Sequence, residues 1–416
     1  MICVIAAPQT PNISKRLALD ALRREHVVHL IDVRHILGMS LAGREVLHQD
    51  DSVLRIKNWA ELFDALKRLA PSVVLDISSS NFLLKVLAWK SRTRGFLLVK
   101  IRDGVLPQMP LGRRVLVRLK TASMGRPSSG NGTANVSGVS RFQGPFWSLA
   151  KVGLDFLKEL ASIYFGPRVD IELIAGLEAG KRATRRARVL ASVASLDLEY
   201  VSSLNSDSKN GIVFLDEAIS DAKDYEIIGL SRPVEPQDYY PWLQQALADL
   251  SVALNSPVVI AIHPDNADRA AFYREMFPNF ECVAHRSMEI LAKSRFAVFH
   301  KSAIALCAIE AGAIPISLGL PMHADLMTLS SIDVFSDSVQ SHMFQVGVAS
   351  VSDSLLRFVK NYDSKTVSTS VRLRYLGDPR KRREDLLLSA CSRLKDGWSK
   401  KEVILRFEKH GIGLET

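Results

Sequence analysis

The sequence predicts an α/β protein built from two doubly wound halves. Short apolar, β-branched segments alternate with amphipathic segments of helical length along most of the 416 residues. Strands that are separated by helices need right-handed crossovers, so each half is expected to form a parallel sheet. At ~100–200 residues per domain, the length allows two or three domains.

The first half is expected to be a Rossmann-like domain over residues 1–150. Residues 121–141 are rich in Gly, Ser and Asn and predict a mobile loop within this domain. The expected strands are 1–7, 27–33, 72–78 and 95–103, and the expected helices are 13–25, 59–69 and 80–92.

Residues 146–165 predict an amphipathic helix that carries several aromatic side chains. Two interpretations stay open for it. The helix could rest on a membrane interface, because basic residues lie nearby, or it could pack its aromatic face against the domain.

The second half is expected to be another Rossmann-like domain, over residues 168–330. Residues 331–416 predict a mostly helical tail that packs back on the domains. The expected strands are 169–176, 211–218, 257–264, 280–285, 296–302 and 314–320, and the expected helices are 238–254, 269–277, 287–294 and 303–312.

The bulk composition limits the partners and the location. The net charge is +10, which favours a membrane surface or an anionic substrate; no helix-turn-helix, zinc-finger or aromatic RNA-binding motif supports nucleic acid. The four cysteines lie far apart and predict reduced thiols with no metal site. No apolar run is long enough to cross a bilayer, and the first residues predict a strand, so a cytoplasmic protein, peripheral on the inner membrane at most, is expected.

Polar residues follow three predicted strands of the second half, where open α/β folds bind ligands. An imidazole, an ammonium and a hydroxyl at the start of a helix would suit a phosphate at this edge. The alternative is that Ser302 only caps a helix and His263 is a hydrogen-bonded core residue. The strand-end residues are Asp216 and Glu217, His263 and Pro264, and His300, Lys301, Ser302 and Ala303.

Here the sequence resembles a known family. "VVIAIHP" followed by "FAVFHKSAIALCAIEAGAIPISL" resembles the carboxyl-terminal half of GT-B glycosyltransferases, above all bacterial sialyltransferases, polysialyltransferases and capsule Kdo transferases. The chain also resembles surface-carbohydrate proteins in which a "FLDE" strand and a "YYP" helix precede the "HP" strand. The resemblance covers 212–320 and implies the GT-B fold, two Rossmann-like domains facing across a cleft.

The resemblance also implies roles for single residues. His263 and Ser302 would hold the phosphate of a CMP-sugar donor, although this chain has Lys301-Ser302-Ala303 where those families usually have paired hydroxyls. Glu310, in "AIEAGAIPI", would reach the ribose of the nucleotide. The whole expected donor-binding set is His263, Pro264, Lys301, Ser302, Ala303, Glu310, Asp216 and Glu217.

The acceptor side is expected in the first half. By the same resemblance Asp103 would be the general base, with Arg102 in place of the first acid of the family's acidic pair; Gly104 allows a sharp turn. A plain strand-ending turn with Asp103 paired to Arg102 is the alternative, and Asp76 is the rival base. The expected acceptor-side set is Gln9, Asn12, Asp76, Ser79, Arg102 and Gly104.

Together these features predict an inverting, metal-independent glycosyltransferase without a cofactor. It would move a sialic-acid-like nonulosonic acid or Kdo from a CMP-activated donor to a bacterial surface glycan, often lipid-linked. Two alternatives remain: a GT-B enzyme that uses a UDP-sugar, GDP-sugar or CDP-polyol donor, and a non-catalytic GT-B-like scaffold in an export complex.

Overall fold

The computed structural model divides the chain into two compact units. The first comprises residues 1–105, 163–204 and 369–416, and the second comprises residues 106–162 and 205–368. The structure describes residues 1–6, 19–37, 53–78, 80–102, 113, 116–117, 169–181, 187–195, 198, 201, 204, 209–221, 232–321, 323–346, 351–377 and 383–409.

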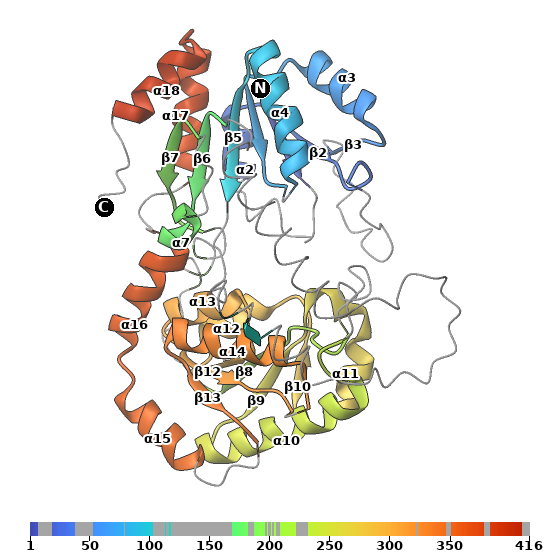
Figure 1. Ribbon diagram of the computed structural model, residues 1–416, viewed down its shortest axis with the longest axis vertical. Coiled ribbons are helices and arrows are strands. Elements are labelled where there is room, and N and C mark those ends of the chain that lie inside the picture. Colours follow the sequence, from blue (N-terminus) through green and yellow to red (C-terminus); the bar gives the residue numbers. More distant parts are fainter. Residues whose placement is uncertain are drawn as a thin grey trace. The chain divides into compact units, whose positions relative to one another are not determined.

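The first unit contains a seven-stranded parallel sheet in the order β3-β2-β1-β4-β5-β6-β7 (Figure 1). The chain starts in the middle at β1, builds outward to β3, returns to β4 and continues to the other edge. This order creates a topological switch point between β1 and β4. The strands are β1 (Ile2–Ala6), β2 (Val28–Asp32), β3 (Val53–Arg55), β4 (Val73–Asp76), β5 (Leu97–Arg102), β6 (Ile171–Ile174) and β7 (Val189–Ser192).

Helices cover both faces of this sheet. On one face, α3 (Trp59–Leu69) and α4 (Asn81–Arg94) bury apolar side chains against alternate strand residues such as Ile5 and Val74. On the other face, α2 (Leu19–Glu25), α17 (Arg383–Lys395) and α18 (Lys400–Lys409) do the same. The alternation arises because successive strand residues point to opposite faces.

The structure corrects the predicted domain boundaries. The strand expected at 169–176 to open the second domain is β6, which pairs with β5 in the first sheet, and β7 follows it there. The tail expected at 331–416 is shared: α17 and α18 pack on the first sheet, whereas residues up to 368 belong to the second unit. An apolar strand pattern shows that a strand is buried, but not which sheet it joins.

The second unit contains a six-stranded parallel sheet in the order β10-β9-β8-β11-β12-β13. Its first strand again lies in the middle, and the order in which strands are added reverses between β8 and β11. Both predicted halves are therefore doubly wound parallel sheets, as the sequence indicates. The strands are β8 (Ile212–Leu215), β9 (Val258–Ala261), β10 (Glu281–Val283), β11 (Phe296–Phe299), β12 (Ile314–Leu318) and β13 (His342–Phe344).

Helices also lie on both sides of the second sheet (Figure 1). The long helix α10 buries Tyr239 and Leu243 in a cluster with Phe214 and Val298, and α11 adds Tyr273 to the same cluster. On the other side α13 contacts β11 and β12. The helices of this unit are α10 (Pro236–Leu254), α11 (Ala270–Met276), α12 (Ser287–Lys293), α13 (Ile304–Glu310), α14 (Leu326–Val339) and α15 (Val351–Asn361).

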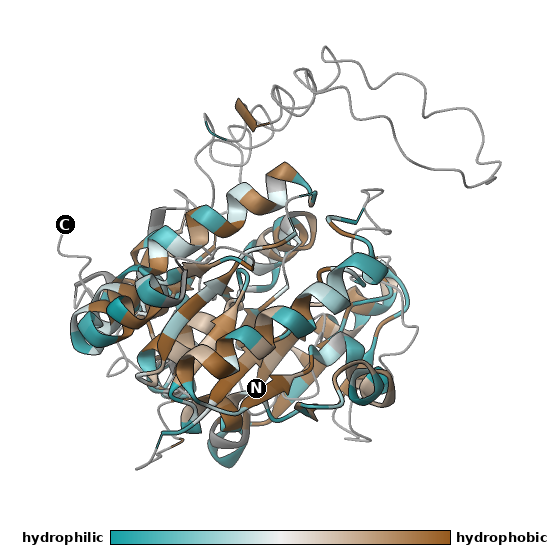
Figure 2. Ribbon diagram, turned by 90° about the horizontal axis from the view of Figure 1, so that it is seen from below, coloured by the Kyte–Doolittle hydropathy of each residue, from teal (hydrophilic) through white to brown (hydrophobic). Residues whose placement is uncertain are grey.

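The hydropathy of the elements follows this layering. The strands are mostly hydrophobic, and the helices combine hydrophobic and hydrophilic residues, as expected for helices that bury one face (Figure 2). No helix in the described part of the chain is long and apolar enough to span a membrane. The predictions for 121–141 and 146–165 fall outside the described residues.

Candidate functional site

The candidate site lies at the carboxyl edge of the second sheet, around its switch point. There β8 lies between β9 and β11, and all three strands are parallel and in register. The strand order reverses between β8 and β11, and open α/β sheets bind ligands beside such a switch point, outside the carboxyl ends of their strands. The loop after β9 carries His263, and the turn after β11 carries Lys301 and Ser302.

Asp216, the residue after β8, fixes the loop that follows β9. One carboxylate oxygen of Asp216 accepts hydrogen bonds from the backbone N–H of His263 at 3.1 Å and from the Tyr273 hydroxyl at 2.7 Å. The other accepts from the Ala218 N–H at 3.0 Å. Asn266 also donates to the Tyr273 hydroxyl, at 2.9 Å. A buried carboxylate with three donors is strongly held, so the β9 loop has a defined position.

Glu217, the next residue, fixes the turn on the other side of β8. Its Oε1 accepts from the backbone N–H of His300 at 2.8 Å and from that of Lys301 at 2.7 Å. The two consecutive acids therefore tie β8 to both neighbouring loops. The sequence predicted that Asp216 and Glu217 bind the sugar donor at this edge. In the structure both carboxylates accept hydrogen bonds from backbone N–H groups of this chain.

The surroundings of Glu217 change its acidity. Burial raises the pKa of Glu217 from 4.5 to about 7, although the two backbone donors and the Lys301 charge act in the opposite direction. The Glu217 carboxyl group therefore changes charge near neutral pH while it holds the turn after β11.

His263 and Pro264 occupy the positions that the strand pattern indicates. β9 ends at Ala261, and Pro264 begins a 3₁₀ helix over Pro264–Arg269, where its missing N–H needs no partner. The His263 side chain is partly exposed at the edge of the sheet.

His300, by contrast, is a hydrogen-bonded core histidine. It is completely buried, its Nδ1 donates to the Leu318 carbonyl at 2.8 Å, and its Nε2 accepts from the Tyr239 hydroxyl at 2.9 Å. Burial lowers the pKa of His300 from 6.5 to about 4. A neutral imidazole that uses both nitrogens for the core cannot bind a ligand, so His300 does not belong to the group predicted at the edge.

The turn after β11 keeps its other polar side chains at the edge. Lys301 Nζ donates to the Ser331 hydroxyl at 3.3 Å, and both Lys301 and Ser302 are partly exposed. Helix α13 begins at Ile304 with Ala303 at its N-cap, and the Ser302 carbonyl accepts from the Ala305 N–H at 3.1 Å. Glu310, expected to reach a ribose, accepts a hydrogen bond from the Ser368 hydroxyl at 2.7 Å.

The carboxyl edge of the first sheet carries ion pairs with buried carboxylates. Asp76 on β4, fully buried, pairs with Lys100 on β5 at 3.0 Å, and Arg102 pairs with the fully buried Glu172 on β6 at 2.7 Å. Asp76, Lys100 and Glu172 are neighbours in the register of three adjacent strands. The rival base Asp76 is therefore engaged in a buried ion pair.

Sequence reasoning missed Lys100 and Glu172, although a signal existed, because a charge inside an apolar strand needs a buried partner. It also missed the buried ion pair between Asp32 and Arg34, 2.7 Å apart, at the end of β2. The other predicted acceptor-side residues lie outside the described residues: Gln9, Asn12, Ser79, Asp103 and Gly104.

Among the residues that the structure describes, no group of three or more His, Cys, Asp or Glu side chains is placed to hold a metal ion. The four cysteines are free and buried.

Comparisons with known proteins show the fold class. The sequence matches no known family profile. It also matches no curated protein. Among solved structures, a putative UDP-N-acetylglucosamine 2-epimerase from Listeria monocytogenes is similar over 96% of this chain and 98% of its own, with 8% identity and a TM-score of 0.50. MurG from Acinetobacter baumannii covers 93% and 99%, with 10% identity and a TM-score of 0.48.

A plant protein, Os79 from O. sativa, solved with UDP, covers 99% and 100%, with 13% identity and a TM-score of 0.46. With two doubly wound parallel sheets in two units, the chain has the GT-B architecture. The resemblance seen in the sequence is confirmed at this level of the fold. The narrower likeness to sialyltransferases and Kdo transferases is not supported by these structures.

Proposed function

We propose that this protein is a glycosyltransferase of the GT-B type that binds a nucleotide-sugar donor at the carboxyl edge of its second sheet. The observation that carries the proposal is the pair of bonds from Asp216 and Glu217 to the two loops flanking β8. These bonds fix the loops that carry His263 and Lys301 on opposite sides of the switch point. A pre-positioned pair of cationic or hydrogen-bonding groups is what stabilisation of a departing phosphate requires.

In this proposal the ligands of the donor phosphate are the side chains of His263, Lys301 and Ser302. Their loops follow β9 and β11, two strands that lie about 10 Å apart at the usual strand spacing, a span that a phosphate group can bridge with side chains. Asp216 and Glu217 are positioning residues rather than ligands. Pro264 and Ala303 shape the two loops, and Glu310 remains the proposed ribose contact.

Two classes of donor compete for this site. A UDP-sugar is the first choice, because the similar structure from Listeria is named for UDP-N-acetylglucosamine. A CMP-linked nonulosonic acid or Kdo is the second choice, and it rests on the "HP" and "HKSA" segments alone. GDP-sugars and CDP-polyols complete the set for testing.

The chemistry follows from the groups that the chain supplies. The carboxylate of Asp103 takes the proton of an acceptor hydroxyl, whose oxygen attacks the anomeric carbon of the donor sugar. The bond between that carbon and the phosphate oxygen breaks, and the nucleotide leaves with the bonding electrons. Lys301 and His263 stabilise the negative charge that develops on this oxygen. Asp103 remains the proposed base because Asp76 already pairs with Lys100.

The proposed acceptor is a surface glycan, either free or lipid-linked. Its proposed contacts are the residues around Asp103 and the first strand-end loops, namely Gln9, Asn12, Ser79, Arg102 and Gly104. Arg102 is the best supported of these, because the buried Glu172 holds its Nε and leaves the guanidinium partly exposed.

A panel assay of product formation tests the proposal. Purified protein is incubated with UDP-, GDP- and CMP-sugars and a glycan acceptor, and sugar transfer is followed by mass spectrometry. His263→Ala should lower transfer by at least ~10²-fold, the usual effect of losing one electrostatic donor. Lys293→Ala, an exposed lysine on α12, is the matched control and should have no effect.

The other outcomes of the panel assign other functions. A change in sugar configuration without transfer would identify an epimerase on the same scaffold. If the protein neither transfers a sugar nor hydrolyses any of the donors, a non-catalytic scaffold is favoured.

A further inference from the structure

A second surface of interest lies on the outer side of α3 and α4, in the first unit (Figure 1). Helix α4 buries Leu83, Leu84 and Leu87 against the sheet. On its opposite side, Phe82 is 63% exposed and Trp89 is 55% exposed. Large aromatic side chains exposed to this degree on one helix mark a surface that contacts another phase or partner.

The exposed rings form one continuous surface with those of α3. Trp59 meets Phe82 edge to face at 5.4 Å between ring centroids, and Trp59 lies 6.3 Å from Phe63. Lys90 Nζ lies over both Phe63, at 4.1 Å, and Trp89, at 4.3 Å. We call this surface, comprising Trp59, Phe63, Phe82, Trp89 and Lys90, the α3–α4 aromatic face.

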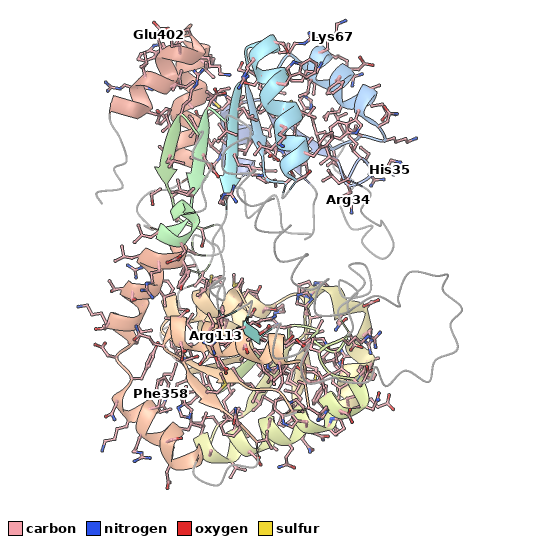
Figure 3. The ribbon with its side chains drawn as sticks, in the orientation of Figure 1. Arg34, His35, Lys67, Arg113, Phe358 and Glu402 are labelled. Carbon is pink, nitrogen blue, oxygen red and sulfur yellow. The ribbon has the colours of Figure 1, made fainter. Side chains whose placement is uncertain are left out.

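The charge of α4 is entirely positive. The helix contains Lys85, Lys90, Arg92 and Arg94 and no acidic residue. Phe82, Lys85, Trp89 and Arg92 follow each other at steps of three, four and three residues, a spacing that places side chains on one side of a helix. All four are exposed. Rings and cations therefore alternate along a single stripe, and Lys67 adds a further exposed cation at the end of α3 (Figure 3).

We propose that the α3–α4 aromatic face binds the surface of an anionic lipid bilayer. Phe82 and Trp89 would enter the boundary between headgroups and acyl chains, where aromatic rings are favoured. Lys85 and Arg92, on the same stripe, would pair with lipid phosphates while their aliphatic stems stay against the rings.

The arrangement fits a bilayer better than two other anionic or apolar partners. The centre of a protein–protein interface is depleted of charged residues, whereas here a cation follows each exposed ring. Single-stranded nucleic acid is bound in a basic groove with stacking rings, whereas these rings stand on the outer sides of two helices. The inference does not depend on the identity of the donor; combined with the proposed function, it would bring the enzyme to a lipid-linked acceptor.

Vesicle sedimentation tests the inference with the full-length chain. Wild-type protein should sediment with vesicles of phosphatidylcholine mixed with phosphatidylglycerol, much less with phosphatidylcholine alone, and less as salt increases. The double variant Phe82→Ser with Trp89→Ser should weaken binding about tenfold or more. The double variant Lys85→Glu with Arg92→Glu should weaken it at least as much, because each basic residue near the membrane contributes to attraction.

Matched variants in the second unit serve as controls. Val252→Ser removes an apolar side chain on α10 that is 82% exposed, and Arg357→Glu with Lys360→Glu makes the same charge change on α15. Both should bind vesicles as the wild type does. All variants alter exposed positions, so unchanged thermal unfolding verifies their folding.

Three results would overturn the inference. The first is equal binding of the wild type to neutral and anionic vesicles, or no binding to either. The second is wild-type affinity of both surface variants for anionic vesicles. The third is binding of a single-stranded oligonucleotide that both surface variants lose while their vesicle binding persists, which would assign the face to nucleic acid.

Discussion

Removing the carboxylate of Asp216 should release the loop that carries His263. In Asp216→Asn, one side-chain oxygen remains to accept from the Ala218 N–H, but the new amide is a donor that faces the His263 N–H and the Tyr273 hydroxyl. Each hydrogen bond to a charged group contributes ~1.5–3 kcal/mol. Tyr273 can reorient and recover part of the loss, so we expect about 3 kcal/mol of local destabilisation.

Amide hydrogen exchange measured by mass spectrometry reports on this loop directly. A loss of about 3 kcal/mol corresponds to exchange on the order of 100-fold faster in peptides that cover 262–269. Tyr273→Phe is the graded control, because it removes one of the bonds to Asp216 and keeps the ring; its effect should be smaller. Strands of the first unit should be unaffected in both variants.

Unchanged exchange at His263 in Asp216→Asn would show that the Asp216 carboxylate does not hold the loop. It would mean that packing, rather than the Asp216 carboxylate, holds the loop. The same variant should also bind the nucleotide donor more weakly, since a mobile His263 no longer meets the phosphate in a fixed position.

Three other predictions concern buried charges. Because the pKa of Glu217 is raised to about 7, the contribution of its carboxyl group to the free energy of unfolding is full below pH 4.5 and is lost as pH rises through 7. Between these pH values the wild type should lose about 3 kcal/mol relative to Glu217→Gln, as measured by denaturant titrations. The same dependence of stability on pH in both proteins would contradict this. The lowered pKa of His300 acts the other way: its contribution to the free energy of unfolding is full above pH 6.5 and is lost as pH falls through 4. His300→Gln should therefore flatten the fall in stability at acid pH, and an unchanged fall would show that the pKa of His300 is the same in the folded and unfolded states. Lys100→Met should destabilise the first unit by ~3–5 kcal/mol because Asp76 is left buried and unpaired. Adding Asp76→Asn to this variant should restore much of the lost stability, as measured by calorimetric unfolding. If the second substitution restores no stability, Lys100 acts through packing.

Much of the fold could be predicted from the sequence because long, periodic segments determine their own structure. Helix α10 and strands β8, β9 and β11 lie where the apolar patterns place them. The missed strands β3, β7 and β13 are edge strands with mixed burial, so they lack the continuous apolar run that marks β8, β9 and β11.

The candidate site could be predicted in part. The edge that carries His263, Lys301 and Ser302 follows from strand order alone, since the carboxyl ends of parallel strands meet on one side. Hydrogen-bond partners could not be predicted, because they depend on which backbone groups a side chain meets in three dimensions. From the sequence Asp216 and Glu217 were therefore expected to bind a ligand, although in the structure they accept hydrogen bonds from backbone N–H groups. His300 was expected at the edge with its neighbour Lys301, although its side chain is bonded within the core.

Calorimetric titration of the purified protein with UDP, with CMP and GDP in parallel, tests whether the carboxyl edge of the second sheet binds a nucleotide. We expect one of these nucleotides to bind, His263→Ala and Lys301→Ala each to weaken this binding about tenfold or more, and Lys293→Ala to leave it unchanged. Wild-type affinity in both site variants, or no binding of any nucleotide, would contradict the assignment of this edge as the donor site.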